Sequence, residues 1–188
     1  MQSLLENSEI RDAVLRLDVD QYHRLCSSGI IPERTELLEG VVVEKMGKSP
    51  LHSWTVGVLD EWFRTHLPPD FFVRVEQPLT IGASEPEPDL AVIAGHRGLF
   101  RDEHPTTAYL VVEVAITTVE LDRAKADIYS QAGIPQYLLV LPKQQQVIVY
   151  GDLSNGVYQS IKTLNKDAAI SMISPCNASL ELSQLFAD

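Results

Sequence analysis

The chain has few cysteines and no long apolar run, and both shortages exclude classes of protein. Its 188 residues include two cysteines, Cys26 and Cys176, too few for the disulfide framework of a small secreted protein. No apolar run approaches the roughly 18 residues that a membrane-spanning helix needs. The first residues lack a basic stretch followed by an apolar one, which argues against a signal peptide. We therefore expect a cytoplasmic protein that does not act at a membrane.

Basic residues are also scarce. The chain has 15 lysines and arginines against 26 aspartates and glutamates, a net charge of -11. This balance argues against a protein that coats nucleic acid nonspecifically, because such proteins usually have a basic surface. It does not exclude a nuclease, since bound divalent cations neutralise part of the charge of an active site.

What the chain does contain is typical of one globular domain. Hydrophobic residues make up 45% of it, its mean hydropathy is -0.02, and its length suffices for a substantial core. We expect residues 1–17 to form an N-terminal segment and residues 18–188 to form a single domain.

Apolar periodicity and turn residues predict an alternation of helices and strands. Helices are expected at residues 19–28, capped by Asp18 or Asp20, at 50–67, capped by Ser49, and at 121–132. Strands are expected at residues 36–46 with a turn at Gly40, and at 71–76, 78–81, 89–94, 109–115, 136–141, 146–150 and 156–164. A polar loop should span residues 95–107, and a helical turn residues 180–186. This order predicts an α/β fold with a mixed sheet.

Three charged residues stand out within this pattern. Asp89 opens the apolar run 88–94, and Glu113 interrupts the apolar run 109–115, although both runs have the composition of buried strands. Lys125 falls within the stripe that Leu121, Ala124, Ile128 and Ala132 form at helical spacing. A lone buried carboxylate is costly unless it is paired, protonated or bound to a metal.

These residue types fit the chemistry of a metal-dependent phosphodiesterase. Asp89 and Glu113 can each supply carboxylate oxygens to Mg²⁺ if their strands are neighbours, and the Val114 carbonyl could add another. A bound cation lowers the pKa of its water and stabilises charge on a phosphate. A nearby lysine, here Lys125, would orient that water or neutralise the transition state.

Seven short motifs together resemble the Uma2 group of the PD-(D/E)XK nuclease superfamily, known largely from cyanobacteria. They are residues 36–40 (ELLEG), 49–52 (SPLH), 77–79 (QPL), 87–92 (EPDLAV), 111–115 (VVEVA), 122–125 (DRAK) and 129–137 (YSQAGIPQY). The ordered set spans about residues 20–150. The resemblance implies a restriction-endonuclease-like core, in which helices flank a mixed sheet, and nuclease chemistry with Mg²⁺ or Mn²⁺.

The resemblance also implies roles for individual residues. In the superfamily motif a lysine follows the glutamate by two residues, but Ala115 stands there in this chain and Ile116 follows it. The family implies that the lysine has moved to the next helix, where Lys125 stands. Glu39, expected on one strand face with Leu37 and Val41, would be a further metal or water ligand. His52, on a helical face with Val56, Leu59 and Phe63, would support the site.

Each assignment has an alternative. Asp89, Glu113 and Lys125 could be structural ion pairs, with Lys125 paired to Asp122 or Tyr129 along its helix. His52 could be a hydrogen-bonded core histidine, and Glu39 only part of a turn.

Three functions follow from these options. The first is an endonuclease with DNA rather than RNA as substrate, forming a homodimer through an apolar edge at residues 147–150. The second is a binding or regulatory module that has lost turnover. The third, a hydrolase with paired carboxylates and no metal, would not need the buried lysine.

Overall fold

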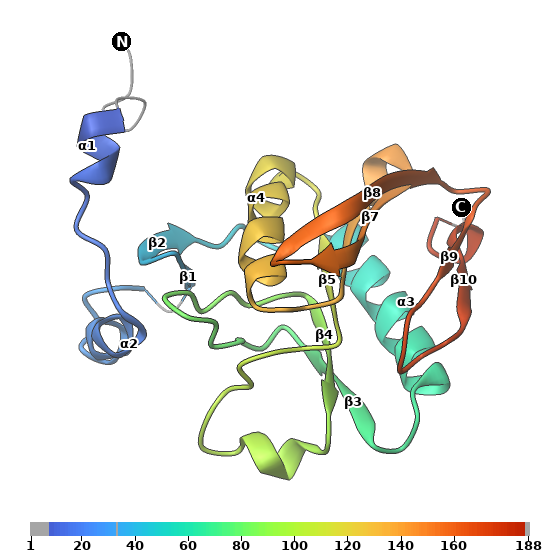
Figure 1. Ribbon diagram of the computed structural model, residues 1–188, viewed down its shortest axis with the longest axis horizontal. Coiled ribbons are helices and arrows are strands. Elements are labelled where there is room, and N and C mark those ends of the chain that lie inside the picture. The colour runs from blue at the N-terminus through green and yellow to red at the C-terminus, as the bar shows by residue number, and fades with distance from the viewer. Residues whose placement is uncertain (1–7, 33, 187–188) are drawn as a thin grey trace.

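A six-stranded mixed sheet forms the centre of the protein in a computed structural model, which describes residues 8–32 and 34–186 (Figure 1). Its strands are, in their order across the sheet, β3 (Phe71–Val75), β4 (Leu90–Ala94), β5 (Leu110–Val114), β6 (Gln136–Leu141), β7 (Gln146–Ser154) and β8 (Val157–Asn165). Only β5 and β6 run parallel among these six strands; the other neighbours are antiparallel. A parallel pair needs a long crossover connection, and helix α4 (Val119–Gln131) supplies it.

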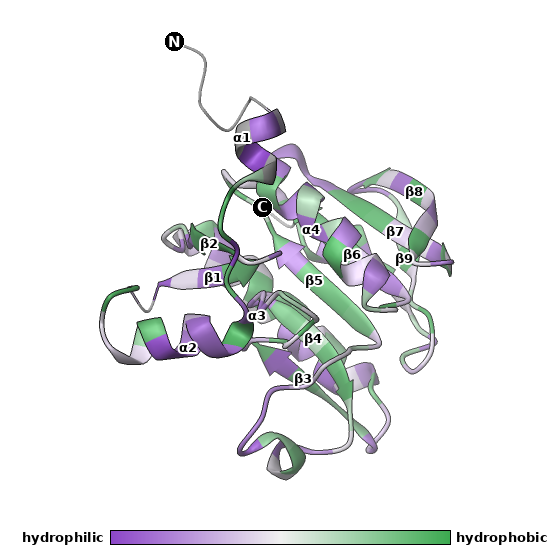
Figure 2. Cartoon of the chain, turned by 60° about the vertical axis from the view of Figure 1, so that its left-hand side comes forward, coloured by the Kyte–Doolittle hydropathy of each residue, from purple (hydrophilic) through white to green (hydrophobic). Residues whose placement is uncertain are grey.

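The two faces of the sheet are covered by different helices. Helix α3 (Pro50–His66) packs Leu59 and Phe63 against the face that carries Val92 and Val112. Helix α4 packs Tyr129 against the opposite face, with Val111 and Tyr137. Figure 2 shows β4 and β5 in the hydrophobic colour along most of their length, as expected for strands buried on both faces.

Smaller elements surround this core. The hairpin of β1 (Thr35–Leu38) and β2 (Val41–Glu44) and the pair of β9 (Ala169–Ser171) and β10 (Ser179–Glu181) are separate two-stranded sheets. The helices α1 (Ser8–Asp12) and α2 (Val19–Ser27) precede them, and α1 lies away from the central sheet in Figures 1 and 2. Short 3₁₀ turns are η2 (Arg97–Phe100), η3 (Pro142–Gln144) and η4 (Leu182–Gln184).

The predicted starts of α2 and α3 are confirmed in atomic detail, whereas α4 begins at Val119, two residues before the expected start. The Asp18 side chain accepts the backbone N–H of Gln21, and the Gln21 side chain accepts that of Asp18, which is a complete capping box. Ser49 caps α3 through the N–H of His52, with Pro50 at the first helical position. The segment expected at residues 1–17 falls partly outside the described residues, so the domain division stays a prediction. No helix among the described residues combines the length and apolar character needed to cross a membrane.

Three expectations about elements were wrong. Residues 78–81 form no strand; Pro78 cannot donate to a ladder, and Ile81 makes only an isolated bridge to Ser84. Residues 180–186 were expected as a helical turn, but β10 takes their first residues and η4 is shorter. The expected edge at residues 147–150 is internal, because β7 pairs with β6 and β8, which leaves β8 at the edge.

The buried stripe of α4 is rotated relative to the expected one. Ala124 is exposed, whereas Asp122, Lys125, Ala126 and Tyr129 are buried. Lys125 therefore lies at the centre of the packed face, and polar groups must satisfy it there.

We expect Gly40→Ala to lower the free energy of unfolding by about 1–3 kcal/mol. Gly40 has φ +78°, and an added Cβ would lie 2.6 Å from the Arg16 Cβ and 2.8 Å from the Leu17 carbonyl oxygen. The matched control is Gly57→Ala in α3, where an added Cβ meets no described atom within 4 Å. That variant should gain about 0.5–1 kcal/mol, because alanine favours a helix interior. Urea unfolding measures both values, and changes of the same sign would contradict the argument.

Candidate active site

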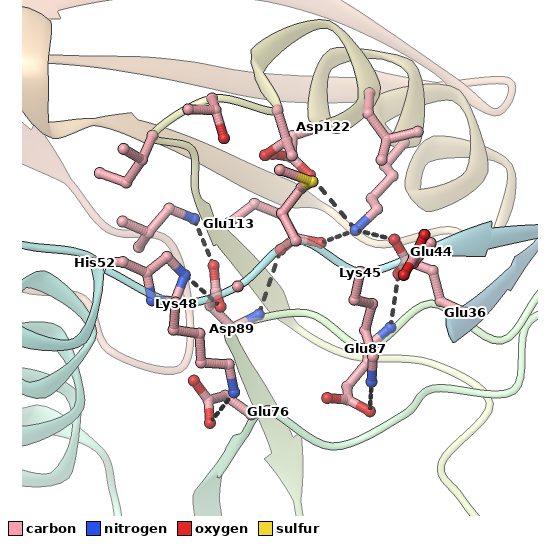
Figure 3. Close-up of a pocket in the computed structure, with 18 residues that line it drawn as sticks. Glu36, Glu44, Lys45, Lys48, His52, Glu76, Glu87, Asp89, Glu113 and Asp122 are labelled. Carbon is pink, nitrogen blue, oxygen red and sulfur yellow. Dashed lines mark hydrogen bonds and ion pairs between the residues drawn. The ribbon is translucent and has the colours of Figure 1, made fainter. Parts of the chain in front are cut away.

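Polar side chains from both faces of the sheet meet in one pocket at the end of β5 (Figure 3). Its interior is about 100 Å³, room for several water molecules or a hydrated ion. The end of β3, the start of β4 and the end of β5 lie at the same edge because β4 runs antiparallel to both neighbours. Besides the ends of these strands, the lining comes from β1, the end of β2, the connections from β2 to α3, from β3 to β4 and from β5 to α4, and the first turns of α3 and α4.

Asp89 and Glu113 are neighbours, as predicted. The register pairs Leu90 with Val112, which places Asp89 beside Glu113. The Asp89 carboxylate accepts the Val114 N–H at 2.7 Å, and the Asp89 N–H donates to Glu113 Oε2 at 3.4 Å. Both carboxylates and Val114 line the pocket, whereas their ligation of a metal stays a prediction.

Lys125 points into this pocket region and is 4% exposed, which confirms its predicted inward orientation. Its Nζ lies 2.9 Å from Glu36 Oε1, 3.0 Å from Glu113 Oε1 and 3.5 Å from Asp122 Oδ1. The Tyr129 hydroxyl donates to the same Glu113 oxygen at 2.7 Å. The alternative pairing of Lys125 with Asp122 is thus present, together with an ion pair to Glu113.

The electrostatics of this cluster are unbalanced. Burial raises the pKa of Glu113 well above its usual range, although Lys125 opposes the rise. Burial lowers the pKa of Lys125, but the carboxylates of Glu113, Glu36 and Asp122 outweigh it, so the net shift is upward. Three buried carboxylates face one ammonium. The excess negative charge can be relieved by a proton or by a further cation.

His52 supports Asp89 from α3. Its Nε2 lies 3.0 Å from Asp89 Oδ1, and its side chain is 12% exposed. The hydrogen bond to Asp89 raises the pKa of His52, although burial opposes it. Among the described residues its buried Nδ1 has no hydrogen-bond partner. Its predicted orientation toward the sheet is confirmed, and its ring fixes one oxygen of Asp89.

Glu39 does not lie in this pocket. It occupies the β1–β2 turn with φ +48°, and its side chain is 60% exposed beside Arg16. The expected strand face with Leu37 and Val41 is wrong because the left-handed turn rotates Glu39 away. Glu36 lines the pocket instead, with one oxygen on Lys125 and the other accepting the Glu87 N–H at 3.2 Å.

Glu36 and Glu76 line the pocket although no local sequence pattern indicates them as site residues. All four residues of β1 are buried, so alternation gave no sign that Glu36 faces the site. Glu76 follows β3 with φ +51°, a left-handed conformation that is uncommon outside glycine. Among the described residues, one group of three offers metal-ligand atoms within 4.8 Å of one another, namely His52, Glu76 and Asp89. Only the pairing of β3 with β4 brings Glu76 there.

Comparisons with known proteins identify the family and the fold. The family model of Uma2, described as "Putative restriction endonuclease", matches residues 19–183. This protein belongs to the Uma2 family. No curated protein matches it. A crystal structure titled as a "putative nuclease belonging to DUF820" from Anabaena variabilis is similar to it, with a TM-score of 0.73 and 17% sequence identity, over 91% of this chain and 98% of that one.

At that identity the structural likeness concerns the fold. The restriction-endonuclease-like core expected from the motifs is confirmed, with its mixed sheet between helices. In this Uma2 protein Ala115 is 1% exposed, and Lys125 reaches Glu113 from α4. An amine therefore stands beside the β5 glutamate although the strand itself carries none.

We expect Lys125→Met to lower the free energy of unfolding by about 3–5 kcal/mol at pH 8, because it leaves buried carboxylates without their cation. Lys125 lowers the pKa of Glu113, so its removal raises that pKa further. A carboxyl group with a raised folded-state pKa favours the fold at low pH and destabilises it as pH rises through that pKa. The loss should thus be smaller at pH 5. Urea unfolding measures both losses. The control is Lys162→Met on exposed β8, whose free energy of unfolding should change by less than about 0.5 kcal/mol. An equal loss at both pH values for Lys125→Met would contradict the coupling of Lys125 to Glu113.

His52 should titrate above the ordinary histidine pKa of about 6.5, because its hydrogen bond to Asp89 favours the charged ring. The stability from this pair is fully present below that ordinary value and is lost as pH rises through the folded-state pKa. Asp89→Asn should lower the His52 pKa, since burial then acts without the carboxylate. Histidine NMR in metal-free buffer measures this, with Asp60→Asn elsewhere in α3 as control; an unchanged His52 titration in Asp89→Asn would argue against the contact.

Proposed function

We propose that this Uma2 protein is an endonuclease that hydrolyses phosphodiester bonds of nucleic acid, DNA in preference to RNA, with Mg²⁺ or Mn²⁺. The observation that carries the proposal is the buried ammonium of Lys125 at 3.0 Å from Glu113, next to Asp89 in an open pocket. A strand-end aspartate, a strand glutamate and an amine together are what metal-assisted hydrolysis of a phosphodiester requires.

The donor set fits a hard divalent cation. Asp89 and Glu113 would hold it, and the Val114 carbonyl would add a further oxygen, since Val114 lines the same pocket. The excess of buried carboxylates over ammonium also favours a bound cation. When bound, the cation supplies a water of lowered pKa and stabilises negative charge on the phosphate.

The remaining residues orient and polarise the site. Lys125 would orient the attacking water and neutralise charge that develops on the phosphate. Glu36, Asp122 and Tyr129 hold Lys125 and Glu113 in place, so little reorganisation is needed. His52 fixes the Asp89 carboxylate. Glu39, exposed in its turn, has no part in this proposal.

The alternative function is a non-catalytic binding or regulatory module. The saturation of Lys125 by three carboxylates favours it, since a purely structural ion cluster would have the same contacts. The net charge of -11 also weakens attraction for nucleic acid. A homodimer and a cytoplasmic location remain proposals, with β8 as the exposed sheet edge through which two copies could pair.

Cleavage of supercoiled plasmid and of RNA with Mg²⁺ or Mn²⁺ tests the proposal. The wild type should nick DNA slowly, and Asp89→Asn or Glu113→Gln should reduce the rate by about 10²-fold or more. Lys125→Met, assayed where it remains folded, should slow cleavage while keeping metal binding.

Glu39→Gln is the matched control, because it neutralises a glutamate of the same family motif outside the pocket; its rate should equal that of the wild type. Wild-type protein that cleaves no DNA or RNA with either metal would favour the binding module. Asp89→Asn at the wild-type rate would refute the assigned site.

A further inference from the structure

Lys48 forms an ion pair with Glu76, whose carboxylate lies next to the proposed metal ligand Asp89. Lys48 Nζ lies 2.6 Å from Glu76 Oε2, and the two side chains are 48% and 31% exposed. Lys48 belongs to the connection between β2 and α3, directly before the cap residue Ser49. Figure 3 shows the pair at the rim of the pocket, on the side of His52 and Asp89.

The backbone conformation directs the Glu76 side chain toward His52 and Asp89. Its left-handed conformation, φ +51°, follows the end of β3, and its N–H donates to the Asp89 carbonyl at 3.0 Å. A carboxylate oxygen of Glu76 thereby lies within 4.8 Å of ligand atoms of His52 and Asp89. Glu76 is thus placed where it could ligate a cation that Asp89 also holds, but an ammonium already neutralises it.

We propose that Glu76 is an additional cation ligand and that Lys48 is a substrate-binding residue which exchanges partners. Without the divalent cation Lys48 neutralises Glu76; with the cation bound, Glu76 turns to it and the released ammonium binds a phosphate of the substrate. This inference rests on the proposed function, since it assumes a cation at Asp89.

The energetics permit this exchange. An ion pair this exposed is weak, so a divalent cation can displace the ammonium at little cost. The double positive charge of the cation also repels Lys48 from Glu76. In an acidic protein, a lysine released only when the site is loaded would bring a phosphate to the pocket at the stage when cleavage can follow.

The neighbouring pair of Lys45 and Glu87 offers a matched comparison. Lys45 Nζ lies 2.7 Å from Glu87 Oε2, and both residues line the same pocket. Glu87, however, is not part of the group of three ligand residues. Lys45→Met therefore removes the same charge from the same pocket without freeing Glu76.

Calorimetric titration of the full chain with Mn²⁺ tests the first half of the exchange. Lys48→Met should tighten Mn²⁺ binding about two- to fivefold, Glu76→Gln should weaken it, and Lys45→Met should change it less than Lys48→Met. In a Glu76→Gln background, Lys48→Met should no longer tighten binding, since the two effects act through one contact. Unchanged or weaker binding in Lys48→Met, or tightening that persists without Glu76, would overturn the exchange.

Binding of a short fluorescein-labelled DNA duplex, with Ca²⁺ in place of Mg²⁺, tests the second half. Lys48→Met should weaken binding and reduce the dependence of log affinity on log salt by about one. Lys162→Met on exposed β8 should leave this slope unchanged. An unaltered slope in Lys48→Met would refute the phosphate contact. Wild-type protein that binds no Mn²⁺ would refute the proposed function and this inference together. Mn²⁺ binding in the wild type, with the same effect of Lys48→Met in the presence and absence of Glu76, would refute only the exchange.

Discussion

One buried ammonium held against three carboxylates is the constraint on which the pocket depends. The Lys125 ammonium forms ion pairs with Glu36 of β1, Glu113 of β5 and Asp122 of its own helix, so one nitrogen contacts three elements of the fold. Their charges do not cancel, and burial makes the surplus costly. A fold that tolerates such a surplus either shifts a proton onto Glu113, whose pKa burial raises, or uses the negative charge to bind a cation. The proposed metal chemistry follows from the second option, and the structural-cluster alternative from the first.

The sheet topology explains why these groups meet. Because β4 runs antiparallel to β3 and β5, the end of β3, the start of β4 and the end of β5 lie side by side. These three strand ends carry Glu76, Asp89 and Glu113 respectively. The crossover from β5 to β6 then returns α4 over the same edge, and Lys125 lies in the second turn of that helix. A lysine on α4 can therefore reach Glu113 although Ala115 stands at the lysine position of the strand motif. The core packing is unaffected, because α4 passes over the end of β5.

The three lysines that line the pocket differ in burial and in the number of carboxylates that they contact. Lys125 is buried and bound on several sides, so its position varies little. Lys45 and Lys48 lie at the rim, half-buried and more exposed respectively, each on one carboxylate. Such pairs are weak and exchangeable. In the proposed function, the fixed amine would face the scissile bond and the movable amines at the rim would offset the repulsion of nucleic acid by a net charge of -11.

The sequence alone determined the α/β order of elements, the capped starts of α2 and α3, and the unusual Asp89, Glu113 and Lys125, since apolar periodicity and buried charge are properties of local sequence. It could not determine which glutamate of residues 36–39 enters the pocket, because β1 is buried at all four positions and the turn at Glu39 is left-handed. It also missed Glu76, which reaches His52 and Asp89 only through the pairing of β3 with β4. Strand pairing and backbone conformation bring distant residues to one point, and these depend on contacts across the whole sheet, which no local pattern records.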